Sequence, residues 1–383
     1  MPPDNPPYRP TAVSPEAVLA RVSRTHETAL TDAEAAALEA QAGASPLARR
    51  LLSMHYFKAG AFAKVVPHAR ELFRLDGNPE SAKNLLAALN RAGLYDEALA
   101  LTTDHAGHFD PVELAAGKCT LYGKLARYGE AVVYGTEALR LKDAAVPLVD
   151  RPPAVVRAFD ASRPERNVIA FSLFGNRQRY FQGALRNAIV APHLYPGWTL
   201  RFYIDDSVPD EIVRGLLAEK AQVRKTPKLD AARFGLFWRF LVEDDPDVNL
   251  YLIRDADSVL NIRERAAVED WLASGKPYHV MRGHPAHCDL ILAGMWGAHR
   301  GNLGHMGKRM LAFVRSRERK LNDRTSDQAF LREAIWPLIR RDALVHDAWF
   351  RFGDARPFRQ ELSLPWPMHV GQNDEARMAA AAG

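Results

Sequence analysis

The feature that most constrains the fold of this chain is a repeat in its first 145 residues. The segments Gly60-Ala61-Phe62, Gly93-Leu94-Tyr95 and Ala126-Arg127-Tyr128 begin at residues 60, 93 and 126, so they recur every 33 residues. Each has a small residue followed two positions later by an aromatic one, and Ala- and Leu-rich segments of helical period surround them. A period of about 34 residues indicates helix–turn–helix units that must stack, because one unit cannot bury its apolar face alone.

This pattern resembles tetratricopeptide repeats and predicts a helical-repeat solenoid over residues 16–145. We expect the small residue at each turn to let two helices approach closely. Solenoids of this type usually bind a peptide or another protein on their concave face. The alternative is that the repeats only brace the rest of the chain.

Composition, in particular the content of proline and of apolar residues, defines the remaining segments. Residues 1–15 hold six prolines and residues 373–383 hold few apolar side chains other than alanine, so both are predicted to be disordered. Residues 146–166, which include Pro152-Pro153, are predicted to link two domains. A length of 383 residues allows about two domains, and 47% hydrophobic with 25% charged residues is typical of globular proteins.

Charge and cysteine content exclude several classes of protein. The net charge of +5 suits a phosphate-bearing substrate but does not argue for a nucleic-acid partner. Two distant cysteines, Cys119 and Cys288, form neither a disulfide framework nor a zinc pattern. No apolar run approaches the roughly 20 residues needed to span a membrane, and the N-terminus lacks the apolar core of a secretion signal. We therefore expect a cytoplasmic protein without a transmembrane segment.

From residue 167 onward, apolar strand-like runs alternate with helical ones. This alternation predicts an α/β domain over residues 167–372 with a mostly parallel sheet. Its first strand ends in Ser172-Leu173-Phe174-Gly175, and neither a Gly-x-Gly-x-x-Gly nor a Walker-type loop follows it. The predicted fold class is thus α + α/β, with the helical repeats first.

The strand Leu250–Ile253 ends in two carboxylates, Asp255 and Asp257, which are separated by Ala256. In open α/β sheets, ligands bind beyond the carboxyl ends of the strands. Both aspartates can reach one hard divalent cation, which takes oxygen ligands and is commonly completed by substrate phosphates. We interpret the pair as a metal–diphosphate site, and the alternative is a solvated turn with an Asp cap.

The α/β domain carries five features in a particular order: the Ser172–Gly175 loop, the aromatic-rich helix Phe237-Trp238-Arg239-Phe240, Asp255-Ala256-Asp257, a strand with Ala293-Gly294, and Asp327-Gln328 ahead of a later histidine. In this order, residues 166–372 resemble GT-A-fold glycosyltransferases, in particular the retaining enzymes of the glycogenin and lipopolysaccharide galactosyltransferase type. The resemblance implies a hexosyltransferase that uses a UDP- or GDP-sugar and Mn²⁺ or Mg²⁺. The metal would stabilise the departing nucleotide.

The resemblance also implies roles for individual residues. The metal ligands would be Asp255, Asp257 and His346, with His369 as the alternative third ligand. The donor-binding residues would be Phe171, Ser172, Leu173, Gly175, Tyr180, Asp205, Arg239, Asp255, Ala256, Asp257 and Gly294. The catalytic residues would be Asp327, Gln328 and Arg239. Asp327 would bind sugar hydroxyls or act as a general base, and the second role would make the enzyme inverting.

The ending His-x-x-Gly-x-x-Lys-Pro-Trp of the glycogenin group is absent, and only His369-Val370-Gly371 is similar to it. Two other functions stay open. One is a catalytically idle sugar-nucleotide-binding scaffold for protein–protein interaction. The other is a nucleotidyltransferase, which would release pyrophosphate where a glycosyltransferase releases a nucleoside diphosphate.

Overall fold

A computed structural model of the protein describes residues 13–43, 45–226, 234–317, 325–350, 352–364 and 368–372. The chain divides into two compact units, Met1–Arg127 and Tyr128–Gly383. The two segments predicted to be disordered lie outside the described residues, apart from residues 13–15. Among the described residues, no helix has the length and apolarity that crossing a membrane requires.

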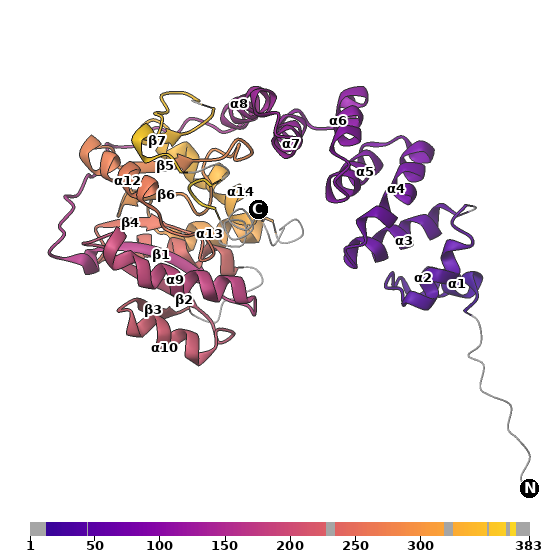
Figure 1. Ribbon diagram of the computed structural model, residues 1–383, viewed down its shortest axis with the longest axis horizontal. Helices are drawn as coiled ribbons and strands as arrows, with labels where there is room; N and C mark the ends of the chain where they lie inside the picture. The colour runs from indigo at the N-terminus through magenta and orange to yellow at the C-terminus, as the bar shows by residue number, and fades with distance from the viewer. Residues whose placement is uncertain are drawn as a thin grey trace, which may run out of the picture. The chain divides into compact units, whose positions relative to one another are not determined.

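The first unit is built from helices. They are α1 (Pro15–Thr25), α2 (Asp32–Glu39), α3 (Pro46–Lys58), α4 (Phe62–Asp76), α5 (Pro79–Arg91), α6 (Tyr95–Asp104), the short 3-10 helix η1 (Ala106–His108) and α7 (Pro111–Lys124). Successive helices pack against one another, as the pairs α3/α4 and α5/α6 show in Figure 1. Their shared core is aliphatic and includes Leu51, Leu52, Leu85 and Leu89.

The repeat in the sequence coincides with the starts of helices. Its aromatic residues, Phe62, Tyr95 and Tyr128, are the first residues of α4, α6 and α8 (Tyr128–Ala144). The small residues adopt left-handed backbone angles, with φ of +74° at Gly60 and +78° at Gly93. A Cβ at either glycine would meet nothing within 4 Å. The expectation of close helix approach is therefore wrong, and the small residue instead allows the positive φ of the turn.

A second signal marks the other helix of each repeat. Ser45, Asn78 and Asp110 cap α3, α5 and α7 with their side chains, and each is followed by a proline. A polar cap satisfies an otherwise unpaired backbone N–H, and proline suits the first helical position because it lacks one. These short-range signals explain why the helical units begin where they do.

Helix α8 groups with the second unit, although its sequence belongs to the repeat region. Lys142 of α8 is buried, donates to the Cys288 carbonyl at 2.7 Å and pairs with Asp289 at 2.6 Å. Its neighbour Asp143 accepts from Trp336 Nε1 at 2.6 Å. These contacts attach the last repeat helix firmly to the α/β unit.

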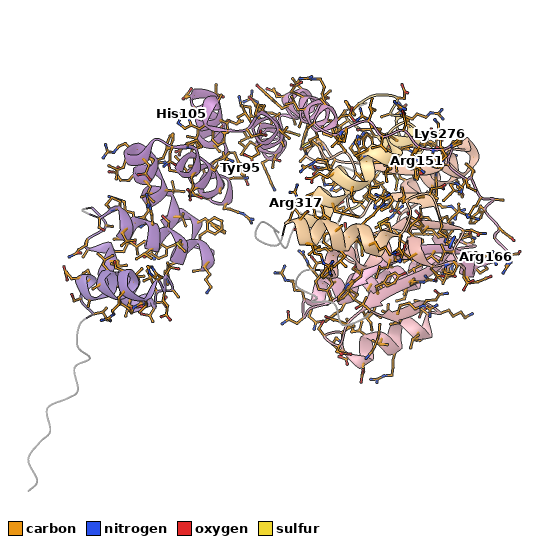
Figure 2. The ribbon with its side chains drawn as sticks, turned by 180° about the vertical axis from the view of Figure 1, so that it is seen from behind. Tyr95, His105, Arg151, Arg166, Lys276 and Arg317 are labelled. Atoms are coloured by element: carbon orange, nitrogen blue, oxygen red, sulfur yellow. The ribbon has the colours of Figure 1, made fainter. Side chains whose placement is uncertain are left out.

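The segment predicted to be a linker is also held by the second unit. Arg151, labelled in Figure 2, donates to the carbonyls of Leu338 at 2.9 Å and Asn302 at 2.7 Å. The backbone N–H of Arg157 donates to His299 Nδ1 at 2.8 Å. The backbone N–H and C=O of Val155 also hydrogen-bond to the Asn302 side chain, both at 2.8 Å, so the segment is held at several points.

The second unit contains a mixed sheet. Its strands are β1 (Asn167–Leu173), β2 (Thr199–Ile204), β3 (Gln222–Lys225), β4 (Leu250–Ile253), β5 (Tyr278–Arg282), β6 (Trp296–His299) and β7 (Ala343–Asp347). In the described residues their order is β3-β2-β1-β4-β6-β5-β7, and β6 alone runs antiparallel to its neighbours. The predicted α + α/β class is confirmed.

Helices cover both faces of this sheet. One face of β1 and β4 packs on α9 (Gln178–Leu194), α10 (Asp210–Ala218) and α12 (Ile262–Ser274). On the other face lies an aromatic cluster of the 3-10 helix η3 (Gly235–Asp244), α13 (Met306–Ser316) and α14 (Ser326–Phe330). The π-helix η4 (Leu331–Ile335) and α15 (Trp336–Ile339) follow α14, while η2 (Pro164–Arg166) and η5 (Gln360–Leu362) are short 3-10 turns.

The strand order creates one point where the chain reverses direction across the sheet. From β1 the chain proceeds to β2 and β3 on one side, and then returns to β4 on the other side. The loops after β1 and β4 therefore diverge and leave a crevice at the carboxyl ends of these strands. This is the position that the sequence predicted for a ligand.

Candidate functional site

A cavity of about 840 Å³ lies at the carboxyl ends of β1 and β4. Five chain segments besides the strand ends and the loops that follow them contribute to it: α9, η3, the loop before β6, α14 and the C-terminal segment. Its lining residues are Ser172, Phe174 to Arg177, Arg179, Tyr180, Leu236, Arg239, Asp255 to Asp257, His287, Leu292 to Met295, Asp327, Gln328 and Gly371. The cavity thus combines several charged side chains with an apolar wall.

The structure brings most of the predicted site residues to this cavity. Those that line it are Ser172, Gly175, Tyr180, Arg239, Asp255, Ala256, Asp257, Gly294, Asp327 and Gln328. Phe171 and Leu173 do not reach it, because alternate residues of β1 face the core under α9, where both are fully buried. Asp205 also lies outside and instead accepts from the backbone N–H of Ser207 at 3.0 Å.

Arg239 connects two of the acidic residues. Its guanidinium is buried, pairs with Asp255 and donates to Asp327 Oδ2 at 2.8 Å. Burial opposes the charge of Arg239, but the two carboxylates outweigh burial and raise the pKa of the arginine. The backbone N–H of Arg239 donates to Ser172 Oγ at 3.0 Å, which ties η3 to the end of β1.

The acidic residues of the cavity differ in exposure and in pKa. The side chain of Asp255 is 42% exposed, whereas that of Asp257 is 13% exposed. Burial and the negative charge of Asp255 raise the pKa of Asp257 to about 6. Burial likewise raises the pKa of Asp327 to about 6, although Arg239 opposes this shift. Two adjacent carboxylates in a poorly solvated site favour a bound cation.

The loop of the two aspartates lies directly against α9. A Cβ at Gly183 would collide with the Ala256 carbonyl and would lie 2.8 Å from the Cα of Asp257. Glycine at this position therefore allows the helix and the loop to touch. Sequence reasoning missed Gly183, although a glycine inside an otherwise helical pattern often has a packing reason.

Gly294 lines the cavity and also makes room for a side chain of its own chain. It lies in the turn before β6, not inside a strand, and a Cβ there would overlap the Asp255 carboxylate and lie 2.9 Å from the Asp255 backbone nitrogen. The close approach is thus made by Asp255 of the same chain. The glycine makes room for the aspartate that faces the cavity.

Replacing Gly294 with alanine is expected to lower the free energy of unfolding of the second unit by about 1–3 kcal/mol, because Asp255 must move away from its place beside Arg239. Tryptophan fluorescence during urea unfolding measures this, since every tryptophan lies between residues 198 and 366. Gly129→Ala is the matched control, because a Cβ at this helical position of the same unit would meet nothing within 4 Å. Equal effects of the two substitutions would contradict the steric argument.

The C-terminal segment packs against the aspartate loop. Ser258 Oγ donates to the Gly371 carbonyl at 2.9 Å, and the Val259 N–H donates to the Gln372 carbonyl at 3.4 Å. The segment carries His369, whose ring centroid lies 5.1 Å from that of the cavity residue His287. The Nδ1 of His369 lies 2.8 Å from the Val370 carbonyl, so a proton on Nδ1 leaves the lone pair on Nε2.

His346 does not reach the cavity. It lies on β7, where its Nδ1 is 2.9 Å from His279 Nε2 and its Nε2 is 3.6 Å from Asp270. Its neighbours on β5 and α12 therefore hold the buried ring. In the described part of the chain, no three His, Cys, Asp or Glu side chains are arranged to hold a metal ion by themselves. Of the two predicted histidines, only His369 lies near the aspartate loop.

Several cavity residues were missed by sequence reasoning as site residues. They are Asn176, Arg177, Arg179, Leu236, Leu292 and Met295. Two arginines directly after the glycine turn of β1 were the available signal. The apolar residues Leu236, Leu292 and Met295 gave none, because their approach to the cavity depends on how distant segments pack.

Comparisons with known proteins leave the family open. No family model matches the sequence, and no curated protein matches it either. Among solved structures, a mutant O-GlcNAc transferase from Thermobaculum terrenum aligns with 62% of this chain and 45% of its own, at 18% identity and a TM-score of 0.33. A 4-diphosphocytidyl-2C-methyl-D-erythritol synthase from Anaerococcus prevotii aligns with 56% of this chain and 94% of its own, at 9% identity and a TM-score of 0.31.

The chain thus spans less than half of the first of these proteins. Likenesses at such low TM-scores say nothing about activity. The function must be argued from the cavity itself.

Proposed function

We propose that the protein is a metal-dependent glycosyltransferase with a GT-A-type domain, which moves a sugar from a nucleoside-diphosphate donor to an acceptor. One observation carries the proposal: Asp255 and Asp257 face a cavity at the carboxyl ends of β1 and β4, where the sheet order reverses. Ligands of open α/β sheets bind at such a point. The cavity is also large enough for a nucleotide-sized ligand.

The residues present fit a divalent cation. Asp255 and Asp257 supply oxygen ligands. Burial and, after it, the negative charge of Asp255 raise the pKa of Asp257, and a bound cation would relieve both effects. His369 lies on the segment that packs against the aspartate loop, but in the described residues it does not form a three-residue ligand group with the two aspartates. Donor phosphates would therefore complete the coordination of Mn²⁺ or Mg²⁺. When bound, the cation would stabilise negative charge on the leaving nucleoside diphosphate.

The sugar would lie against α14. Gln328 Oε1 is buried in the cavity wall and has no hydrogen-bond partner among the described residues. A buried hydrogen-bond acceptor without a partner destabilises the free protein. A sugar hydroxyl that donates to this oxygen would therefore bind more favourably. Asp327 accepts from Arg239 and from the Gln328 backbone N–H, which holds its negative charge beside the reacting sugar.

The helical unit would dock the acceptor or a protein partner. Helical-repeat solenoids usually bind a peptide or another protein on their concave face. The proposed location of the enzyme is the cytoplasm.

One observation favours a nucleotidyltransferase as the second candidate. Arg177 and Arg179 follow the β1 turn and line the cavity, and basic residues after the first strand suit a triphosphate. The two activities differ in the product that leaves with the metal. A glycosyltransferase releases a nucleoside diphosphate, and a nucleotidyltransferase releases pyrophosphate.

The test is a screen of UDP- and GDP-sugars and of nucleoside triphosphates, with Mn²⁺, with Mg²⁺ and with EDTA. We expect slow, metal-dependent release of UDP or GDP from one class of sugar nucleotide. Release of pyrophosphate from a triphosphate would instead establish the second candidate. If no nucleotide binds under any metal condition, both enzyme proposals fail.

A further inference from the structure

Each aspartate of the proposed metal site faces an arginine of its own chain, and the two arginines differ in exposure. Arg239 is buried between Asp255 and Asp327, which hold it from two sides. Arg179 Nε lies 3.5 Å from Asp257 Oδ2, and the side chain of Arg179 is 32% exposed. Arg239 is thus enclosed by two carboxylates, whereas Arg179 is partly exposed and lines the cavity that a ligand would enter.

The position of Arg179 is set by α9. Gly183 lies one turn further along this helix and touches the backbone of Asp257, so Arg179 is held at the cavity wall. Its guanidinium carbon lies 4.7 Å from the centre of the Tyr180 ring, and its Nη2 donates to the Tyr180 hydroxyl at 2.7 Å. Tyr180 thus helps to hold the guanidinium beside the cavity.

We infer that Arg179 exchanges partners during ligand binding: it neutralises Asp257 while the cavity is free of ligand, and it binds the donor diphosphate once a divalent cation occupies Asp257. This inference rests on the proposed function and adds a binding residue and an order of events to it. A cation at Asp257 repels the guanidinium, and the planar fork of arginine suits phosphate oxygens.

The exchange gives Arg179 opposite effects on two affinities, that for the cation and that for the nucleotide. Without nucleotide, the arginine competes with the cation for Asp257 and weakens cation binding. With the cation in place, the arginine is released towards the phosphates and strengthens nucleotide binding. A residue that merely supports the fold would weaken both, because both ligands need the folded cavity.

Titration calorimetry with Arg179→Met tests the inference, first with Mn²⁺ alone and then with UDP and with GDP at saturating Mn²⁺. We expect the variant to bind Mn²⁺ about fivefold more tightly, which corresponds to loss of one partly exposed ion pair. We expect it to bind the nucleoside diphosphate at least about tenfold more weakly, because a charge-assisted hydrogen bond is lost. Arg186→Met is the matched control on the exposed part of the same helix, and it should change neither affinity.

The outcomes separate this inference from the proposed function. If the wild type binds Mn²⁺ and a nucleoside diphosphate but Arg179→Met leaves Mn²⁺ affinity unchanged or lowers it, the partner exchange is overturned and the glycosyltransferase proposal stands. An unchanged nucleotide affinity overturns it equally. If the wild type binds neither ligand, the proposed function fails and the inference fails with it. Tighter Mn²⁺ binding also shows that the variant is folded.

Discussion

Asp257→Asn is expected to abolish metal-dependent donor binding and to slow sugar transfer by about a thousandfold, because several kcal/mol of leaving-group stabilisation depend on the bound cation. The substitution keeps the size of the side chain and removes its charge. Asp257 is well suited to reveal this effect, since its side chain is mostly buried and lines the cavity beside Asp255.

The measurements are Mn²⁺ affinity by calorimetry and initial rates with the donor that the screen identifies. Asp247→Asn is the matched control, because Asp247 is exposed and lies before the opposite end of β4. It should keep both the affinity and the rate of the wild type. Undiminished Mn²⁺ affinity in Asp257→Asn would show that this carboxylate is not a metal ligand.

Arg239→Met is expected to lower the free energy of unfolding of the second unit by about 3–5 kcal/mol, because it leaves buried carboxylates without their partner. Asp327 carries most of this loss, since its side chain is only 6% exposed. Adding Asp327→Asn to Arg239→Met should recover part of the lost stability, because it removes the unpaired charge. Urea unfolding followed by tryptophan fluorescence measures the free energy of unfolding of the wild type, of Arg239→Met and of the double variant.

Arg341→Met serves as the control for this experiment. Arg341 pairs with Asp150 at 3.1 Å, but the two side chains are 59% and 96% exposed. Such exposed pairs contribute at most about 1 kcal/mol. If Arg239→Met costs no more than Arg341→Met, or if the double substitution restores nothing, then Arg239 does not neutralise the buried acids as the structure indicates.

Much of the local structure could be predicted because it depends on residues close together in the chain. The recurring small and aromatic residues mark helix starts at Phe62, Tyr95 and Tyr128, since turns and caps are set within a few residues. The apolar run Leu250–Ile253 forms a strand, and its two aspartates necessarily lie at the carboxyl end. Their place in the cavity follows from the topology of an open sheet.

One prediction about glycine was wrong, because Gly60 allows a positive φ and does not make a close helix contact. Gly294 makes room for Asp255, and its predicted role toward a sugar stays a prediction. Glycine is required in either case, so its presence alone cannot distinguish a turn from a close approach. Only the atoms around it can do so.

The sequence by itself determined the elements, their class and the pair of aspartates at the end of β4. The tertiary structure decided which distant residues meet them: Arg239 and Arg179 beside the two carboxylates, Gly183 against their loop, and the segment of His369 in place of His346. The reason is physical. Secondary structure follows from interactions within a few residues, whereas a site is formed by side chains whose distances depend on how the whole sheet and its helices pack.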